Sequence, residues 1–144
     1  MELNGLPLHP LVVHAAVVFG PLAALVAVAY VVVPRWRDRL RRPVLALAVV
    51  AVGALLTAYL SGRSFLDSKP ELAGSTAVAT HQDRAQQLLW ITIAFGVVTL
   101  LAVGLGERAG RVRIVLDVLL ALVAVALLVS VALTGDAGAR AVWG

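Results

Sequence analysis

Three histidines are the residues of this sequence best suited to chemistry. His9 and His14 lie in LHPLVVH, where a polar N-terminal stretch becomes a long apolar run, and His81 precedes another such run. An ionisable side chain at the edge of an apolar span is energetically costly, so each imidazole needs a partner or a purpose. A neutral imidazole in this position ligates haem or another metal, donates to a quinone carbonyl, or binds a backbone carbonyl.

The composition is that of an integral membrane protein. Of the 144 residues, 61% are hydrophobic and 14% are charged, and the mean hydropathy is +0.97. Ordinary soluble domains are roughly 45–50% apolar. The net charge of +4 does not indicate nucleic-acid binding, because the basic residues lie in short clusters between apolar runs. The chain has no cysteine, which excludes disulfides, thiolate metal sites and covalent haem attachment.

Four apolar runs are long enough to cross a bilayer, which takes about 20 helical residues. We place these spans at about 10–33, 43–62, 84–106 and 112–134. The sequence therefore predicts an all-α integral membrane protein, a four-transmembrane-helix up-down bundle that forms a single domain over residues 1–144.

The arginines predict the orientation of the bundle. The loop PRWRDRLRRP and the loop over 107–113 together carry eight arginines, whereas the other side carries four basic residues. Basic residues in short loops favour the cytoplasmic side. We therefore expect both termini and the longest loop, 63–80, to be extracytoplasmic. Within the fourth span, Asp117 is expected to pair with Arg113, four residues before it.

The bundle topology suggests a partner for His14. The first and third spans of an up-down bundle are diagonal neighbours, so we expect His14 and His81 to face each other near the extracytoplasmic end. Two such histidines are the axial ligands of a non-covalent b-type haem. Arg84 and Arg140 are expected to pair with its propionates. His9 lies one residue before the first span, and we expect it to cap the helix or pack at the interface.

Other functions remain open. His9, His14 and His81 with Asp67 or Asp136 are a possible zinc or copper shell, and a quinone site is a further alternative. The chain is otherwise a structural or accessory subunit whose histidines only form hydrogen bonds. Without a nucleophile-elbow motif, we expect an electron carrier or accessory subunit rather than an enzyme. The expected partners are the lipid bilayer and a redox membrane complex, respiratory or other, or a second copy of the chain.

The first and third spans share features that predict an internal repeat. Each begins near a histidine, contains Phe-Gly (Phe19-Gly20 and Phe95-Gly96) and ends at an arginine-rich loop. Two helical hairpins related by an axis along the membrane normal would produce this pattern.

Short motifs along the whole chain resemble those of a family of small bacterial membrane proteins, catalogued as domain of unknown function twenty-two thirty-one. The family pattern is HP-x-LVH, a Gly-Asp element after the second span, a histidine before the third span, and G-x-x-GA-x-x-V near the end. The matching residues are His9, Pro10, Leu11, Val12, Val13, His14, His81, Gly135, Gly138, Ala139 and Val142. The second element departs from the pattern, because Ser61-Gly62 is followed by Asp67 only after RSFL.

The resemblance implies a bacterial protein, which we expect in the cytoplasmic (inner) membrane. Some members of the family are fused to c-type cytochrome or Rieske-type modules, which implies an electron-transfer setting by analogy.

Overall fold

A computed structural model describes residues 2–3, 6–72, 74–106 and 110–144. This part of the chain contains four long helices: α1 (Leu8–Val32), α2 (Arg37–Asp67), α3 (Thr76–Leu105) and α4 (Arg111–Trp143). The short strands β1 (Glu2–Leu3) and β2 (Leu6–Pro7) pair antiparallel before α1. The 3-10 helices η1 (Pro34–Trp36) and η2 (Pro70–Leu72) lie in the first and second connections. The predicted all-α class is confirmed.

All four helices are long and apolar enough to cross a membrane. Large apolar side chains cover the outside of the bundle: Leu25, Val49 and Ile114 are 56%, 68% and 64% exposed. Soluble proteins rarely expose apolar surface on this scale, whereas lipid chains cover it at no cost.

The helices extend past the predicted spans. The second span was predicted at 43–62, yet α2 runs from Arg37 to Asp67, and α4 continues to Trp143. Hydropathy identifies only the segment that fits the hydrocarbon, about 30 Å thick. The 31 residues of α2 span about 46 Å, because backbone hydrogen bonds continue through polar residues beyond the hydrocarbon. Because of these additional turns, Arg37 belongs to α2 and Gly138 to α4, although both lie outside the predicted spans.

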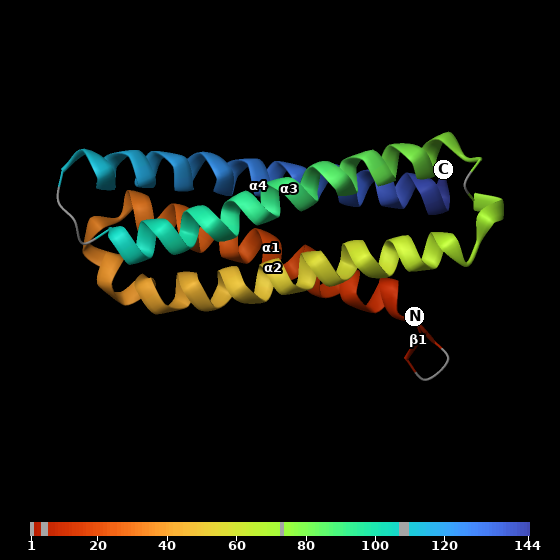
Figure 1. The fold of residues 1–144 in the computed structure, drawn as a ribbon, viewed down its shortest axis with the longest axis horizontal. Helices are drawn as coiled ribbons and strands as arrows, with labels where there is room; N and C mark the ends of the chain where they lie inside the picture. Colours follow the sequence, from red (N-terminus) through yellow and green to blue (C-terminus); the bar gives the residue numbers. More distant parts are fainter. Residues whose placement is uncertain (1, 4–5, 73, 107–109) are drawn as a thin grey trace.

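The helices pack around a common axis in an alternating arrangement. Helix α1 packs against α2 and α4, and α3 packs against the same two helices. Successive helices run in opposite directions, both termini lie at one end of the bundle, and η1 lies at the other (Figure 1). Helices α1 and α3 are therefore diagonal neighbours, and so are α2 and α4.

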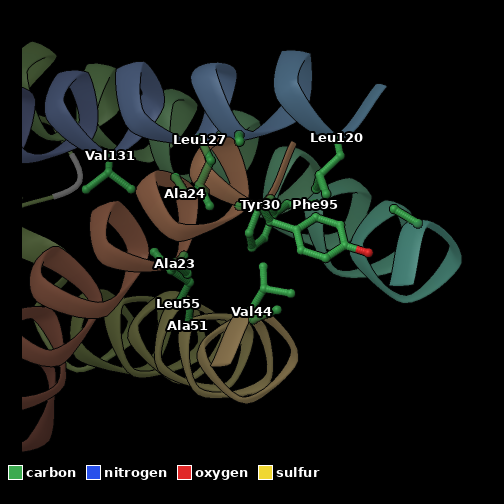
Figure 2. Packing of buried hydrophobic residues seen from close by; sticks show 14 of the residues in the cluster. Ala23, Ala24, Tyr30, Val44, Ala51, Leu55, Phe95, Leu120, Leu127 and Val131 are labelled. Atoms are coloured by element: carbon green, nitrogen blue, oxygen red, sulfur yellow. The ribbon is translucent and has the colours of Figure 1, made fainter. Parts of the chain in front are cut away.

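The core repeats between the two hairpins. Buried residues follow each of His9 and His81 after seven, eleven, fourteen, eighteen and twenty-one residues: Ala16, Gly20, Ala23, Ala27 and Tyr30 in α1, and Leu88, Thr92, Phe95, Thr99 and Ala102 in α3. Similarly, they precede Gly62 and Gly138 by seven, eleven, fourteen and eighteen residues: Leu55, Ala51, Ala48 and Val44 in α2, and Val131, Leu127, Ala124 and Leu120 in α4. Figure 2 shows side chains from both hairpins meeting in this core.

This shared spacing supports the predicted repeat and corrects its register. The two Phe-Gly pairs are not equivalent, because Phe95 occupies the position of Ala23 and not that of Phe19. At the first four of these positions a small residue on α1 corresponds to a larger residue on α3, and at the fifth Tyr30 corresponds to Ala102. A pair such as Ala23 and Phe95 fills the core that two phenylalanines would overfill.

Candidate functional site

His9 is joined to α2. Its Nδ1 lies 3.1 Å from the carbonyl oxygen of Ala58 and 3.2 Å from Oγ of Ser61. The Ser61 hydroxyl donates to the same carbonyl oxygen at 3.0 Å. Because a carbonyl oxygen only accepts, Nδ1 of His9 carries the proton, and Nε2 of the neutral ring keeps its lone pair. The Phe65 ring stacks beside the imidazole, with 6.3 Å between the ring centroids.

His81 is joined to α4 in the same manner. Its Nδ1 lies 3.1 Å from the carbonyl oxygen of Thr134, so this nitrogen also carries the proton. The Thr134 hydroxyl donates in return to the carbonyl oxygen of Arg84, at 3.3 Å, which ties α4 back to α3. Within the described residues, no hydrogen bond engages Nε2 of His9 or His81.

A glycine of the neighbouring helix leaves space for each imidazole. Gly62 follows the acceptor Ala58 by four residues, and Gly138 follows Thr134 by four residues. A side chain that reaches a helix carbonyl from outside passes over the residue one turn later, because the two lie on one face. A Cβ added to Gly62 would lie 2.9 Å from Cε1 of His9, and one added to Gly138 would lie 3.0 Å from Cε1 of His81.

His9 and His81 therefore form an equivalent pair at one end of the bundle. They occupy matching positions on diagonal helices, at the end where both chain termini lie (Figure 1). The arrangement provides two oriented imidazoles, each with an Nε2 lone pair available to a ligand.

The structure corrects the expected position of His14. This residue is exposed, and its Nδ1 lies 2.6 Å from the carbonyl oxygen of Pro10, one turn earlier in the same helix. His14 precedes the buried Ala16 by two residues, a rotation of about 200° around the helix, so it lies on the outer face of α1. The prediction that His14 faces His81 across the core is therefore wrong, and His9 is the histidine of α1 whose position matches that of His81 in α3.

Helical periodicity indicates that His9 lies on the buried face of α1, which the sequence interpretation missed. His9 precedes Ala16 by seven residues, which is close to two turns. It therefore continues the stripe of small residues Ala16, Gly20, Ala23 and Ala27. Small residues mark the face on which membrane helices approach one another.

The two arginines predicted to pair with haem propionates form hydrogen bonds with side chains of their own helices. Nη1 of Arg84 donates to Oε1 of Gln87 at 3.3 Å, and Nε of Arg140 donates to Asp136 at 2.8 Å. Both arginines are exposed. In residues 2–3, 6–72, 74–106 and 110–144, no three His, Cys, Asp or Glu side chains are grouped as a metal site. The structure thus does not unite His9, His14 and His81 with Asp67 or Asp136.

An ion pair that the sequence interpretation missed lies at the opposite end of the bundle. Nη1 and Nη2 of Arg37 donate to the two carboxylate oxygens of Asp117 at 2.8 and 2.7 Å, and the guanidinium lies 4.4 Å from the Tyr30 ring centroid. The predicted partner Arg113 is present at 3.7 Å. The side chains of Arg37 and Asp117 are only 12% and 17% exposed. This fork joins the diagonal helices α2 and α4.

Replacing Gly62 or Gly138 by alanine should displace the adjacent imidazole. The added methyl group overpacks the contact, and we expect the free energy of unfolding in detergent to fall by about 1–3 kcal/mol. Gly135→Ala is the matched control on α4, because nothing lies within 4 Å of its added Cβ and alanine favours the helix. Equal stability of Gly138→Ala and Gly135→Ala, measured by unfolding in SDS mixed micelles, would contradict the close contact between Gly138 and His81.

Comparison with known proteins gives one result that extends over nearly the whole chain. Comparisons with curated proteins and with solved structures found no match. The family described as "Predicted membrane protein (DUF2231)" matches residues 5–144. This range contains all four helices and all three histidines. The chain therefore belongs to the DUF2231 family of membrane proteins, the family whose motifs its sequence resembles.

Proposed function

We propose that this protein is a membrane-bound b-type haem protein that transfers electrons, with His9 and His81 as the axial ligands. One observation carries the proposal: both imidazoles donate from Nδ1 to a backbone carbonyl of the next helix and keep Nε2 for a ligand. Histidines that ligate metals commonly donate their other ring N–H to a carbonyl or carboxylate, which fixes the tautomer and the ring orientation.

The number of ligands favours haem over an isolated metal ion. A bis-histidine haem needs two imidazoles from opposite directions, because the porphyrin supplies the other iron ligands. A zinc site needs three or four protein ligands, and the described residues contain no such group. His9 and His81 supply two imidazoles from the diagonal helices α1 and α3, which supports the haem rather than the zinc alternative. Bound haem would supply a one-electron iron couple, and the chain would orient it and shield it from water.

The proposal includes an orientation in the bacterial cytoplasmic membrane. The histidines lie at the end of the bundle that carries both termini, and η1 with its neighbouring arginines lies at the other (Figure 1). Since arginine-rich short connections favour the cytoplasmic side, the histidine pair belongs near the extracytoplasmic face. A redox membrane complex is the proposed electron partner.

The absorption spectrum of the detergent-purified protein tests the haem directly. We expect a Soret band and, after reduction, α and β bands from about one haem per chain. His9→Ala and His81→Ala should each abolish the six-coordinate spectrum, because each variant removes one axial ligand. His14→Ala is the matched control from the same turns of α1, and it should keep the wild-type spectrum.

Three results would contradict this assignment. A chain that remains colourless after haem supplementation would exclude the cofactor. Loss of the spectrum in His14→Ala but not in His9→Ala would exclude this ligand pair. Colourless protein with stability losses confined to His9→Ala and His81→Ala would assign both histidines to helix packing, as in an accessory subunit.

A further inference from the structure

The two histidines share one backbone contact but differ in the side chains around each ring. In both hairpins, Nδ1 donates to the carbonyl oxygen four residues before the glycine that leaves space for the imidazole. Since Gly62 and Gly138 occupy equivalent positions, each residue of α2 near His9 has a counterpart in α4 at the same distance from the glycine. The counterparts show which ring is held by more contacts.

Two side chains of α2 hold the imidazole of His9 in addition to the carbonyl group. Oγ of Ser61, a residue that is only 2% exposed, lies 3.2 Å from Nδ1. The Phe65 ring is stacked beside the imidazole, with 20° between the two ring planes. Contacts between rings at this separation have a preferred geometry. Rotation of the His9 ring would therefore break a hydrogen bond and a ring contact together.

The imidazole of His81 has neither of these side chains. The counterpart of Ser61 is Ala137, one residue before the glycine of α4. The counterpart of Phe65 is Ala141, three residues after that glycine. A methyl group neither accepts a hydrogen bond from Nδ1 nor stacks beside a ring. The internal repeat thus conserves the backbone contact and omits the two side-chain contacts.

The side chain of Thr134 does not compensate for this difference. Its hydroxyl donates to the carbonyl oxygen of Arg84, so it holds the backbone of α3 and not the imidazole. Among the described residues, the carbonyl oxygen of Thr134 is the hydrogen-bond partner of His81, and no ring is stacked beside that imidazole. The two rings are therefore unequally fixed.

We propose that His9 is the fixed axial ligand and His81 the exchangeable one, so that a small neutral haem ligand such as carbon monoxide binds in place of His81. This inference rests on the proposed haem function. An axial imidazole resists replacement more strongly when outer contacts hold its ring in the ligating orientation. Ser61 and Phe65 are positioning residues that supply such contacts to His9 alone. The exchange transfers no electron, because the incoming ligand donates a lone pair in place of the lone pair of Nε2.

Carbon monoxide binding to the reduced, haem-loaded full chain tests the exchange. We expect one carbon monoxide per haem, observed as a shift of the Soret band. The double variant Ala137→Ser/Ala141→Phe gives His81 the side chains that hold His9. It should lower the affinity for carbon monoxide about tenfold, the effect of one hydrogen bond or ring contact on the competing imidazole. Val142→Phe is the matched control, because Val142 is 71% exposed, and it should keep the wild-type affinity.

The reverse change separates the two ligands. The double variant Ser61→Ala/Phe65→Ala removes the additional contacts of His9 and makes the two rings equivalent. Either imidazole is then replaceable, so the affinity for carbon monoxide should rise by only about twofold, because the states open to the ligand double. A rise of tenfold or more, with no change in Ala137→Ser/Ala141→Phe, would assign the exchange to His9 and overturn the proposal.

A measurement without haem distinguishes failure of this inference from failure of the proposed function. In the haem-free full chain, carbon-13 relaxation at Cε1 should give a lower order parameter for His81 than for His9, and Ala141→Phe should raise the value for His81. Equal order parameters, or a reduced haem protein that binds no carbon monoxide, would overturn the unequal ligands and leave the haem assignment intact. A chain that takes up no haem would overturn the proposed function and the exchange with it.

Discussion

Replacing Asp117 by alanine should lower the free energy of unfolding by about 3 kcal/mol. The change removes both acceptors of the Arg37 fork and leaves a largely buried guanidinium without its counter-charge. Breaking one side of a buried ion pair costs about 3–5 kcal/mol. The low end applies here because the two side chains keep 12% and 17% of their exposure. Equilibrium unfolding in SDS mixed micelles, followed by far-ultraviolet circular dichroism, measures the change.

Asp136→Ala provides the matched control on the same helix. Asp136 also pairs with an arginine, Arg140 at 2.8 Å, but these side chains are 58% and 74% exposed. Exposed pairs contribute little to stability, so this variant should unfold at the wild-type SDS concentration. If Asp117→Ala and Asp136→Ala unfolded at the same point, the fork between α2 and α4 would have no special role in stability.

Replacing Phe95 by alanine should lower the free energy of unfolding by about 2–4 kcal/mol. Phe95 is completely buried and is one of the largest side chains in the core (Figure 2). Membrane helices are held together by packing rather than by transfer from water. The loss therefore comes chiefly from the cavity and the missing contacts of the ring. The SDS unfolding assay reports it directly.

The internal repeat predicts that a ring at position 23 can partly replace the ring lost from position 95. Ala23 is the counterpart of Phe95 on the diagonal helix and is also completely buried. Ala23→Phe alone should overpack the core and cost about 1–3 kcal/mol. Combined with Phe95→Ala, it places one ring in the same layer, so the double variant should be more stable than the sum of the two losses implies by at least about 1 kcal/mol. Strict additivity would refute the equivalence of these positions.

The two ends of the bundle carry different polar groups. At the end with the termini, His9 and His81 lie on α1 and α3, and each is held by the helix that follows it. At the other end, Arg37 and Asp117 join α2 and α4. The histidines thus lie on one pair of diagonal helices and the ion pair joins the other pair. The apolar core lies between these two polar groups.

The sequence alone determined the class of protein and its family. Long apolar runs separated by charged clusters leave a helical membrane protein as the consistent solution, because unpaired backbone groups cannot face lipid. The motifs around His9, His81 and Gly138 led to the family that matches residues 5–144. The ends of the helices did not follow, since hydropathy records the depth of the hydrocarbon and not the end of backbone hydrogen bonding.

Only the tertiary structure decided which histidine faces inward and what Asp117 binds. His9 and His14 are close in sequence, and the choice between them depends on the rotation of α1, which its packing against α2 and α4 fixes. Arg37 and Asp117 lie on different hairpins, so no local spacing links them. The role of Gly62 and Gly138 also depends on tertiary structure. Each glycine leaves space for an imidazole of the preceding helix, and the sequence does not show which side chain fills that space.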